Sequence, residues 1–182
     1  MALKSTIFKV ELQIADMDRN YYQTHALTIA QHPSETDERM MVRLLAFALH
    51  ASDNLAFGQG LSTDDEADLW QKDLTGAIEL WIDVGLPDER DIRKACGRSR
   101  NVVVLSYGRT ADVWWKQQQS KLGKLSNLTV LNLPAEKTQQ MASLATRTMQ
   151  LQCTVQDGEM LVSGETGSVN IEASILLGKG KH

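Results

Sequence analysis

The segment at residues 78–96 places the strongest constraint on the fold of this chain. Residues 78–84 alternate between apolar and other side chains, which is the period-two pattern of a β-strand. Pro87 follows, and residues 88–96 then have the pattern of an amphipathic helix. An almost continuous apolar run at 101–107, a helix around Trp114 and a strand at 128–133 come next. Strands that alternate with helices in this order predict right-handed crossovers and a partly parallel sheet.

The two ends of the chain carry a different pattern. Residues 6–14 and 21–29 both alternate, which predicts two antiparallel neighbours. Helices are expected at 34–51 and 134–145, and the tail from 149 to 177 predicts two or three strands with a tight turn at 156–159. We therefore expect one α/β domain over residues 1–182, with a single mixed β-sheet flanked by helices and antiparallel strands added at both termini.

The helix expected at 34–51 carries charged residues on two of its faces. Ser34 is the expected N-cap, and acidic residues fill the first turn, where they favour the helix dipole. Glu35, Arg39 and Arg43 fall on one flank at i, i+4 spacing and can pair with one another. Glu38 lies on the inward face of the same helix.

The composition of the chain excludes several classes of protein. The chain has 182 residues, of which 42% are hydrophobic and 23% charged, as is typical of a globular protein. No apolar run reaches the roughly 20 residues that span a bilayer, and the N-terminus lacks the apolar core of a signal peptide, so we expect a cytoplasmic protein with no membrane partner. The net charge of −4 argues against a basic coat for nonspecific nucleic-acid binding, although it allows a local basic groove. Cys96 and Cys153 are expected to be free thiols.

Acidic residues are the strongest candidates for a functional site. The sequence contains no glycine-rich phosphate loop, no Gly-x-Ser-x-Gly elbow and no His-Glu-x-x-His pair. Carboxylates are found instead at Glu38, in the patch at residues 64–68, and at Glu79 and Asp83, which share one face of the strand at 78–84. Hard oxygen ligands of this kind suit Mg²⁺ or Mn²⁺ better than zinc.

Each of these groups also has a purely structural interpretation. Glu38 can pair with an arginine such as Arg93 while it stabilises the helix N-terminus. The patch at 64–68 can be a solvated loop, and Glu79 can face water from an edge strand. The tryptophans, among them Trp81 and Trp114, are expected in the core rather than as platforms for stacked bases.

The chain resembles the YaeQ family of bacterial proteins over nearly its whole length. The resemblance rests on long motifs peculiar to that family: MALKSTI at 1–7, HPSETDERMM at 32–41, LWIDVGLPDER at 80–90 and KAC at 94–96. It implies a variation on the PD-(D/E)xK nuclease fold, the restriction-endonuclease-like fold shared with type II restriction enzymes.

The resemblance also implies a set of carboxylates at the site. The glutamate that such enzymes often carry on the helix before the core sheet is matched by Glu38. The Pro-Asp element is matched by Ala67 and Asp68, so the proline is missing and the aspartate is kept. The (D/E)-x-Lys strand can be aligned in two registers, with either Glu79 or Asp83 as its carboxylate.

The lysine of that strand motif is absent in both registers. Trp81 or Gly85 stands in its place. Because some divergent members of the fold supply the lysine from the following helix, Lys94 is the first candidate. Arg90 is the second and Lys72 the third.

The chemistry implied is metal-assisted hydrolysis of phosphodiester bonds in DNA or RNA. Asp68 and one of Glu79 or Asp83 would bind Mg²⁺ or Mn²⁺, Glu38 would support them, and Lys94 would stabilise or orient the attacking hydroxide. The missing strand lysine and the acidic net charge favour an alternative, a non-catalytic module on a nuclease scaffold that binds nucleic acid or a protein in transcription. A third interpretation is an interaction protein with no nucleic-acid role.

Overall fold

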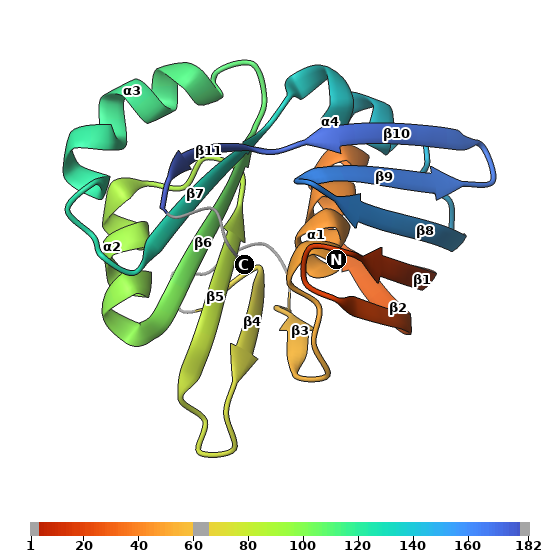
Figure 1. Ribbon diagram of the computed structural model, residues 1–182, viewed down its shortest axis with the longest axis horizontal. Coiled ribbons are helices and arrows are strands. Elements are labelled where there is room, and N and C mark those ends of the chain that lie inside the picture. Colours follow the sequence, from red (N-terminus) through yellow and green to blue (C-terminus); the bar gives the residue numbers. More distant parts are fainter. Residues whose placement is uncertain (1–3, 60–65, 179–182) are drawn as a thin grey trace.

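The fold consists of two mixed β-sheets with a helix packed between them (Figure 1). The computed structural model describes residues 4–59 and 66–178, and these contain four helices. The expectation of one mixed α/β domain is met, but the expectation of a single sheet is wrong. Most of the strands near the termini form a sheet of their own on the far side of this helix, and the last strand of the described chain joins the other sheet.

The central sheet has the strand order β11-β7-β6-β5-β4-β3. Its strands are β3 (Leu55–Phe57), β4 (Leu69–Lys72), β5 (Ile78–Val84), β6 (Ser99–Tyr107), β7 (Leu128–Leu133) and β11 (Ser174–Leu177). The strands β5, β6 and β7 are parallel and are joined through α2 (Glu89–Arg98) and α3 (Ala111–Leu122). The alternation of strands and helices predicted from the sequence is therefore confirmed.

The terminal sheet has the order β10-β9-β8-β1-β2. Its strands are β1 (Thr6–Asp16), β2 (Tyr21–Gln31), β8 (Thr148–Gln156), β9 (Glu159–Gly164) and β10 (Gly167–Glu172). β1 and β2 form the predicted antiparallel pair, while β8 runs parallel to β1. In the turn between β8 and β9, Asp157 and Gly158 have φ angles of 53° and 80°, as a two-residue hairpin turn requires. The tight turn predicted at 156–159 is confirmed.

The helix between the sheets is α1 (Asp37–His50), and ten of its 14 residues are buried. It contacts β1 of the terminal sheet, β4 and β5 of the central sheet, and α4 (Ala135–Ala142). The predicted N-cap, Ser34, is wrong. Thr36 caps the helix by accepting a hydrogen bond from the Arg39 amide, whereas the Ser34 hydroxyl is engaged by the His32 ring. α4 ends three residues earlier than expected.

The helices α2 and α3 cover the other face of the central sheet and enclose a second core (Figure 1). Trp81 of β5 and Trp114 of α3 are buried in this core, as expected for tryptophans. The Trp114 indole N–H donates a hydrogen bond to the Pro87 carbonyl at 2.9 Å and so fixes the entry into α2. None of the helices in the described ranges is long and apolar enough to cross a membrane.

The two cysteines are free thiols, as predicted. Burial raises the pKa of Cys96 to about 11. Burial, together with the negative charge of Asp16, raises the pKa of Cys153 to about 12. Both thiols are neutral near pH 7 and therefore poor nucleophiles.

Candidate functional site

A small pocket of about 250 Å³ opens at the carboxyl end of β5. We call it the carboxylate pocket, because four of its lining residues are acidic and one is basic: Glu66, Asp68, Asp83, Asp91 and Arg39. These residues come from the chain before β4, from β5, from α2 and from α1. Ligands of open α/β sheets are commonly bound beyond the carboxyl ends of parallel strands, where this pocket lies.

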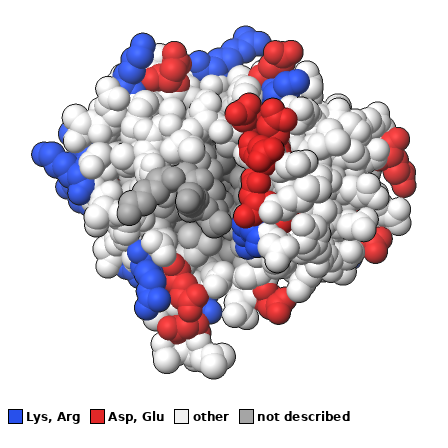
Figure 2. Space-filling view, viewed as in Figure 1, with Lys and Arg blue, Asp and Glu red and all other residues white. Residues whose placement is uncertain are grey.

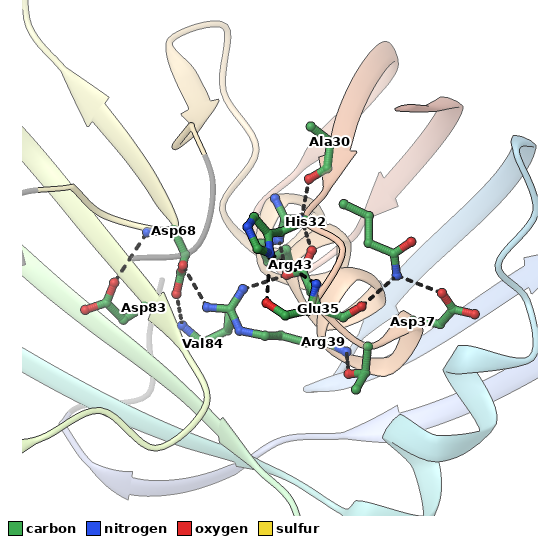
Figure 3. A network of polar contacts seen from close by, with 12 residues as sticks. Ala30, His32, Glu35, Asp37, Arg39, Arg43, Asp68, Asp83 and Val84 are labelled. Atoms are coloured by element: carbon green, nitrogen blue, oxygen red, sulfur yellow. Dashed lines mark hydrogen bonds and ion pairs between the residues drawn. The ribbon is translucent and has the colours of Figure 1, made fainter. Parts of the chain in front are cut away.

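Asp68 is the most constrained acid of the pocket, with a relative exposure of only 3%. Its Oδ1 accepts a hydrogen bond from Arg39 Nη2 at 2.9 Å, and its Oδ2 accepts one from the Val84 amide at 2.8 Å. Figure 3 shows this carboxylate between β5 and the Arg39 guanidinium. The interpretation of this position as a solvated loop is therefore wrong, because Asp68 is buried and both of its oxygens are bound.

Asp83 lies next to Asp68 (Figure 3) and is bound more weakly by its neighbours. Its Oδ1 accepts a long hydrogen bond, 3.4 Å, from the Asp68 amide. Burial and the negative charge of Asp68 raise the pKa of Asp83 to about 6. This carboxyl group therefore titrates near neutral pH, and a nearby cation would favour its charged form.

Arg39 connects the pocket to a buried chain of ion pairs. Its Nη1 lies 2.6 Å from Glu35 Oε2, and Glu35 also binds Arg43, which donates to the Ala30 carbonyl of β2 at 2.8 Å. Burial alone would lower the pKa of Arg39, but the charges of Asp68 and Glu35 outweigh burial and raise it. The pairing of the arginines with Glu35 was predicted. The link to Asp68 was not, because Asp68 lies 29 residues further along the chain.

Two glycines shape the chain around the carboxylates. A Cβ on Gly58 would lie 2.0 Å from the Ala67 carbonyl oxygen, and the Gly58 amide donates to the Asp68 carbonyl at 2.8 Å. The β3–β4 pair can therefore approach closely just where Asp68 is positioned. Gly85 has φ of +102°, which turns the chain directly after Asp83 and Val84.

The structure shows the surroundings of the two positions at which the resemblance implies a lysine. In one register the lysine position is Trp81, which has 3% exposure and packs beneath α2. In the other it is Gly85, whose positive φ would strain any L side chain. Both positions line the pocket, but a lysine at 81 would replace a buried tryptophan of the second core, and one at 85 would require a strained backbone.

Glu79 and Glu38 both lie apart from the carboxylate pair. Glu79 is half-buried, accepts a hydrogen bond from Gln71 Nε2 at 2.9 Å, and precedes Asp83 by four strand residues, or about 13 Å. Glu38 accepts a hydrogen bond of 2.7 Å from the Thr138 hydroxyl of α4. Among the described residues, neither is part of the pocket lining.

The predicted basic residues do not line the pocket either, within the part of the chain that the structure describes. Lys94 is exposed on α2, three residues after Asp91, so both lie on neighbouring turns of one helix face. Lys72 lies over the Trp70 ring, with its Nζ 3.8 Å from the ring centroid. Arg90 is exposed.

Two other expectations about charged residues have clear outcomes. Arg93 forms an ion pair with Glu89 on its own helix, so the expected pairing with Glu38 is wrong. Of the acidic patch at 64–68, residues 64 and 65 lie outside the described residues. Within residues 4–59 and 66–178, no group of three or more His, Cys, Asp or Glu side chains is arranged to hold a metal ion.

Comparison with known proteins identifies the family. The family model described as "YaeQ protein" matches residues 1–173. The chain belongs to the YaeQ family. It is 46% identical to the YaeQ protein of Salmonella typhi over 173 residues, which cover 94% of this chain and 96% of that protein. It is 45% identical to the Escherichia coli K12 protein over 172 residues, with 94% and 95% covered.

Two solved structures of YaeQ proteins have the same fold as this chain. The protein from Xanthomonas axonopodis pv. citri superimposes with a TM-score of 0.93 at 50% identity and covers 96% of this chain and 99% of its own. The protein from Pseudomonas syringae gives a TM-score of 0.92 at 35% identity, with 96% and 97% covered.

Proposed function

We propose that the carboxylate pocket binds one Mg²⁺ or Mn²⁺ ion through Asp68 and Asp83, and that the protein hydrolyses phosphodiester bonds in DNA or RNA. The observation that carries the proposal is the placement of these two carboxylates side by side in one pocket at the end of a parallel strand. The same placement supports a restriction-endonuclease-like, PD-(D/E)xK scaffold, in which acids on adjacent strands serve one metal.

The residues of the pocket fit a hard divalent cation. Mg²⁺ in proteins is usually held by one or two carboxylates, with water and phosphate oxygens completing the octahedron. Asp68 and Asp83 supply two carboxylates, and Glu66 and Asp91 make the surrounding potential more negative. The proton on Asp83 competes with the cation, so affinity should rise as the pH rises through about 6.

In this proposal each residue has a definite role. The bound ion would polarise the phosphate and acidify a water molecule. Arg39 and the Val84 amide hold Asp68 in one orientation, while Asp83 accepts a long hydrogen bond from the Asp68 amide and interacts with the Trp81 indole, which leaves acceptor capacity for a ligand. Asp83 rather than Glu79 is then the strand ligand.

Lys94 takes the role of the absent strand lysine. Its ammonium group is exposed on α2, one turn beyond Asp91 of the pocket lining, and can contact a phosphate of a bound strand. Glu38 stabilises the packing of α1 against α4 through Thr138 and takes no part in metal binding.

Cleavage assays with single- and double-stranded DNA and RNA, in Mg²⁺ or Mn²⁺, test the proposal. We expect Asp68→Asn and Asp83→Asn to lower cleavage at least about 100-fold, because even loss of a supporting group costs 10- to 100-fold at metal sites. Glu79→Gln is the matched control on the same strand face and should retain activity. Activity that is equal in the Asp83→Asn protein, or absent from the unmodified protein on every substrate, would contradict the proposal.

The Lys94 role has its own test on the same substrates. Lys94→Ala should lower the rate of cleavage and leave the affinity for Mn²⁺ unchanged, since Lys94 is not a ligand. Arg90→Ala is the control on the same helix and should change neither quantity. If both variants behave alike, Lys94 has no special role.

One observation favours the second candidate, a non-catalytic binding module for nucleic acid or for a protein in transcription. Arg39 already forms an ion pair with Asp68, and this pair partly neutralises the proposed metal ligand. Nucleic-acid affinity that falls steeply with salt, without cleavage and without dependence on Mg²⁺, is the result that this candidate predicts.

A further inference from the structure

A second and larger cavity, of about 550 Å³, lies between the two sheets near the C-terminus of α1. We call it the intersheet pocket. Its volume lies within the range of small-molecule sites, roughly 300 to 1,000 Å³. Leu49 of α1, Leu131 of β7 and Val155 of β8 contribute to its walls, together with Ala173 and Ile175 at β11. The pocket can therefore enclose an apolar body.

The polar groups of this pocket are mostly acidic. Asp16, Asp18 and Asp157 line it, with Arg19 as the basic residue among the described lining. Asp16 is 1% exposed; its Oδ1 accepts a hydrogen bond from the Arg19 amide at 3.0 Å. Its Oδ2 forms a long ion pair with Arg19 Nη1 at 3.9 Å, a distance too great for a hydrogen bond. One oxygen of a buried carboxylate therefore still has capacity for a donor.

Arg19 is not available to bind an anion in the intersheet pocket. Its two terminal nitrogens donate to the carbonyls of Leu49 and Ala51, at 3.0 and 2.7 Å, and so cap the end of α1. Its guanidinium carbon also lies 5.0 Å from the centroid of the Tyr21 ring. These hydrogen bonds from the Arg19 guanidinium hold the C-terminal end of α1 against the turn after β1.

Further acidic residues extend the negative charge beyond the rim. Glu159 and Glu172 are exposed and lie directly opposite each other on β9 and β10, an arrangement that is unfavourable without a nearby cation. Figure 2 shows a band of Asp and Glu side chains beside a hollow near the middle of this face. The surroundings of the pocket therefore favour a positively charged ligand.

We propose that the intersheet pocket binds a small amphipathic organic cation, an amine with an apolar aliphatic or aromatic body. The ammonium group donates to the free oxygen of Asp16 and interacts with Asp18 and Asp157, and the apolar body packs against Leu131 and Val155. The site is separate from the carboxylate pocket and shares no lining residue with it among those described.

Three probes of similar shape and different charge test this proposal: 2-phenylethylamine, 2-phenylethanol and 3-phenylpropionate. Titrations followed by amide NMR of the whole protein should show shifts at Val155, Gly158 and Ile175 with the amine. We expect the alcohol and the carboxylate to bind at least about tenfold more weakly, since they lack the ion pair.

Two variants are used, so that the test still holds if one of them fails to fold. Asp16→Asn should weaken amine binding about tenfold, because it removes the buried charge. Asp157→Asn should weaken it about threefold and should fold normally, since asparagine tolerates the positive φ at this turn. Asp112→Asn, at an exposed position on α3, is the charge-matched control and should leave binding unchanged.

Several results would overturn the proposal. These are equal or tighter binding of the alcohol or the carboxylate at the same amides, shifts by the amine only elsewhere, and unchanged amine affinity in both variants. The proposal is also contradicted if about 10 mM amine shifts none of these amides, because this concentration exceeds the millimolar dissociation constants of weak specific binding.

Discussion

Asp83→Asn should stabilise the folded protein at neutral pH even though it removes a proposed metal ligand. Burial and the charge of Asp68 raise the pKa of Asp83 from 3.8 to about 6. At 1.36 kcal/mol per pH unit, this difference corresponds to about 3 kcal/mol of lost stability when Asp83 is ionised. Because asparagine keeps an acceptor for the Asp68 amide but must itself lose hydration in this pocket, we expect a net gain of about 2 kcal/mol at pH 7.

The stability difference between the variant and the unmodified protein should depend on pH in a definite direction. The unfolded chain releases the Asp83 proton near pH 3.8, while the folded protein keeps it up to about pH 6. The unmodified protein therefore loses stability as the pH rises from about 4 to 6, and the variant lacks this loss. The advantage of the variant should be complete at pH 7 and below about 1 kcal/mol at pH 4.

Urea unfolding in the absence of divalent metal, at pH 4, 5.5 and 7, measures this difference. Asp112→Asn in the first turn of α3, where the side chain is exposed, is the control and should lower stability by no more than about 1 kcal/mol, by an amount that does not grow with pH above about 5. A variant that is less stable than the unmodified protein at pH 7, or a difference that does not change with pH, refutes the reasoning.

The remaining predictions concern ion pairs and glycines around the carboxylate pocket and in α2. Glu35→Ala should destabilise the protein by about 3 kcal/mol or more in urea unfolding, because it leaves Arg43 charged, buried and unpaired. Glu89→Ala, which breaks an ion pair whose arginine is 63% exposed, should cost less than about 1 kcal/mol, and similar costs for the two would contradict the role of burial. Gly58→Ala should lower both the unfolding midpoint and the affinity for Mn²⁺, since its Cβ would meet the Ala67 carbonyl. Gly97→Ala in α2, where a Cβ meets nothing within 4 Å, should add up to about 1 kcal/mol of stability.

The order of elements between β5 and β7 could be predicted because each carries a local signal. Alternation, a proline and a helical period are all visible within a few residues. The separation into two sheets could not, since it depends on which edges pair. β8 lies parallel to β1, with Lys9 opposite Thr148, and no local pattern indicates that pairing.

The acids of the site were predictable as a group but not as partners. The sequence places Glu79 and Asp83 on one strand face, and the structure shows that only Asp83 reaches the pocket with Asp68. The hydrophobic periodicity of a strand or helix indicates which of its faces a residue occupies. It does not indicate which residues of other elements lie near that face. Glu38 illustrates the same limit, because its inward face meets Thr138 of α4.

The central claim is that Asp68 and Asp83 bind a divalent cation, and a Mn²⁺ titration followed by electron paramagnetic resonance at pH 7 tests it most directly. The unmodified protein should bind one Mn²⁺ ion, Asp83→Asn should lose this site, and Glu79→Gln should keep it. Affinity of the unmodified protein should fall as the pH drops through about 6, because the proton on Asp83 then competes with the ion. No Mn²⁺ binding by the unmodified protein, or equal binding by the Asp83→Asn protein, would contradict the claim.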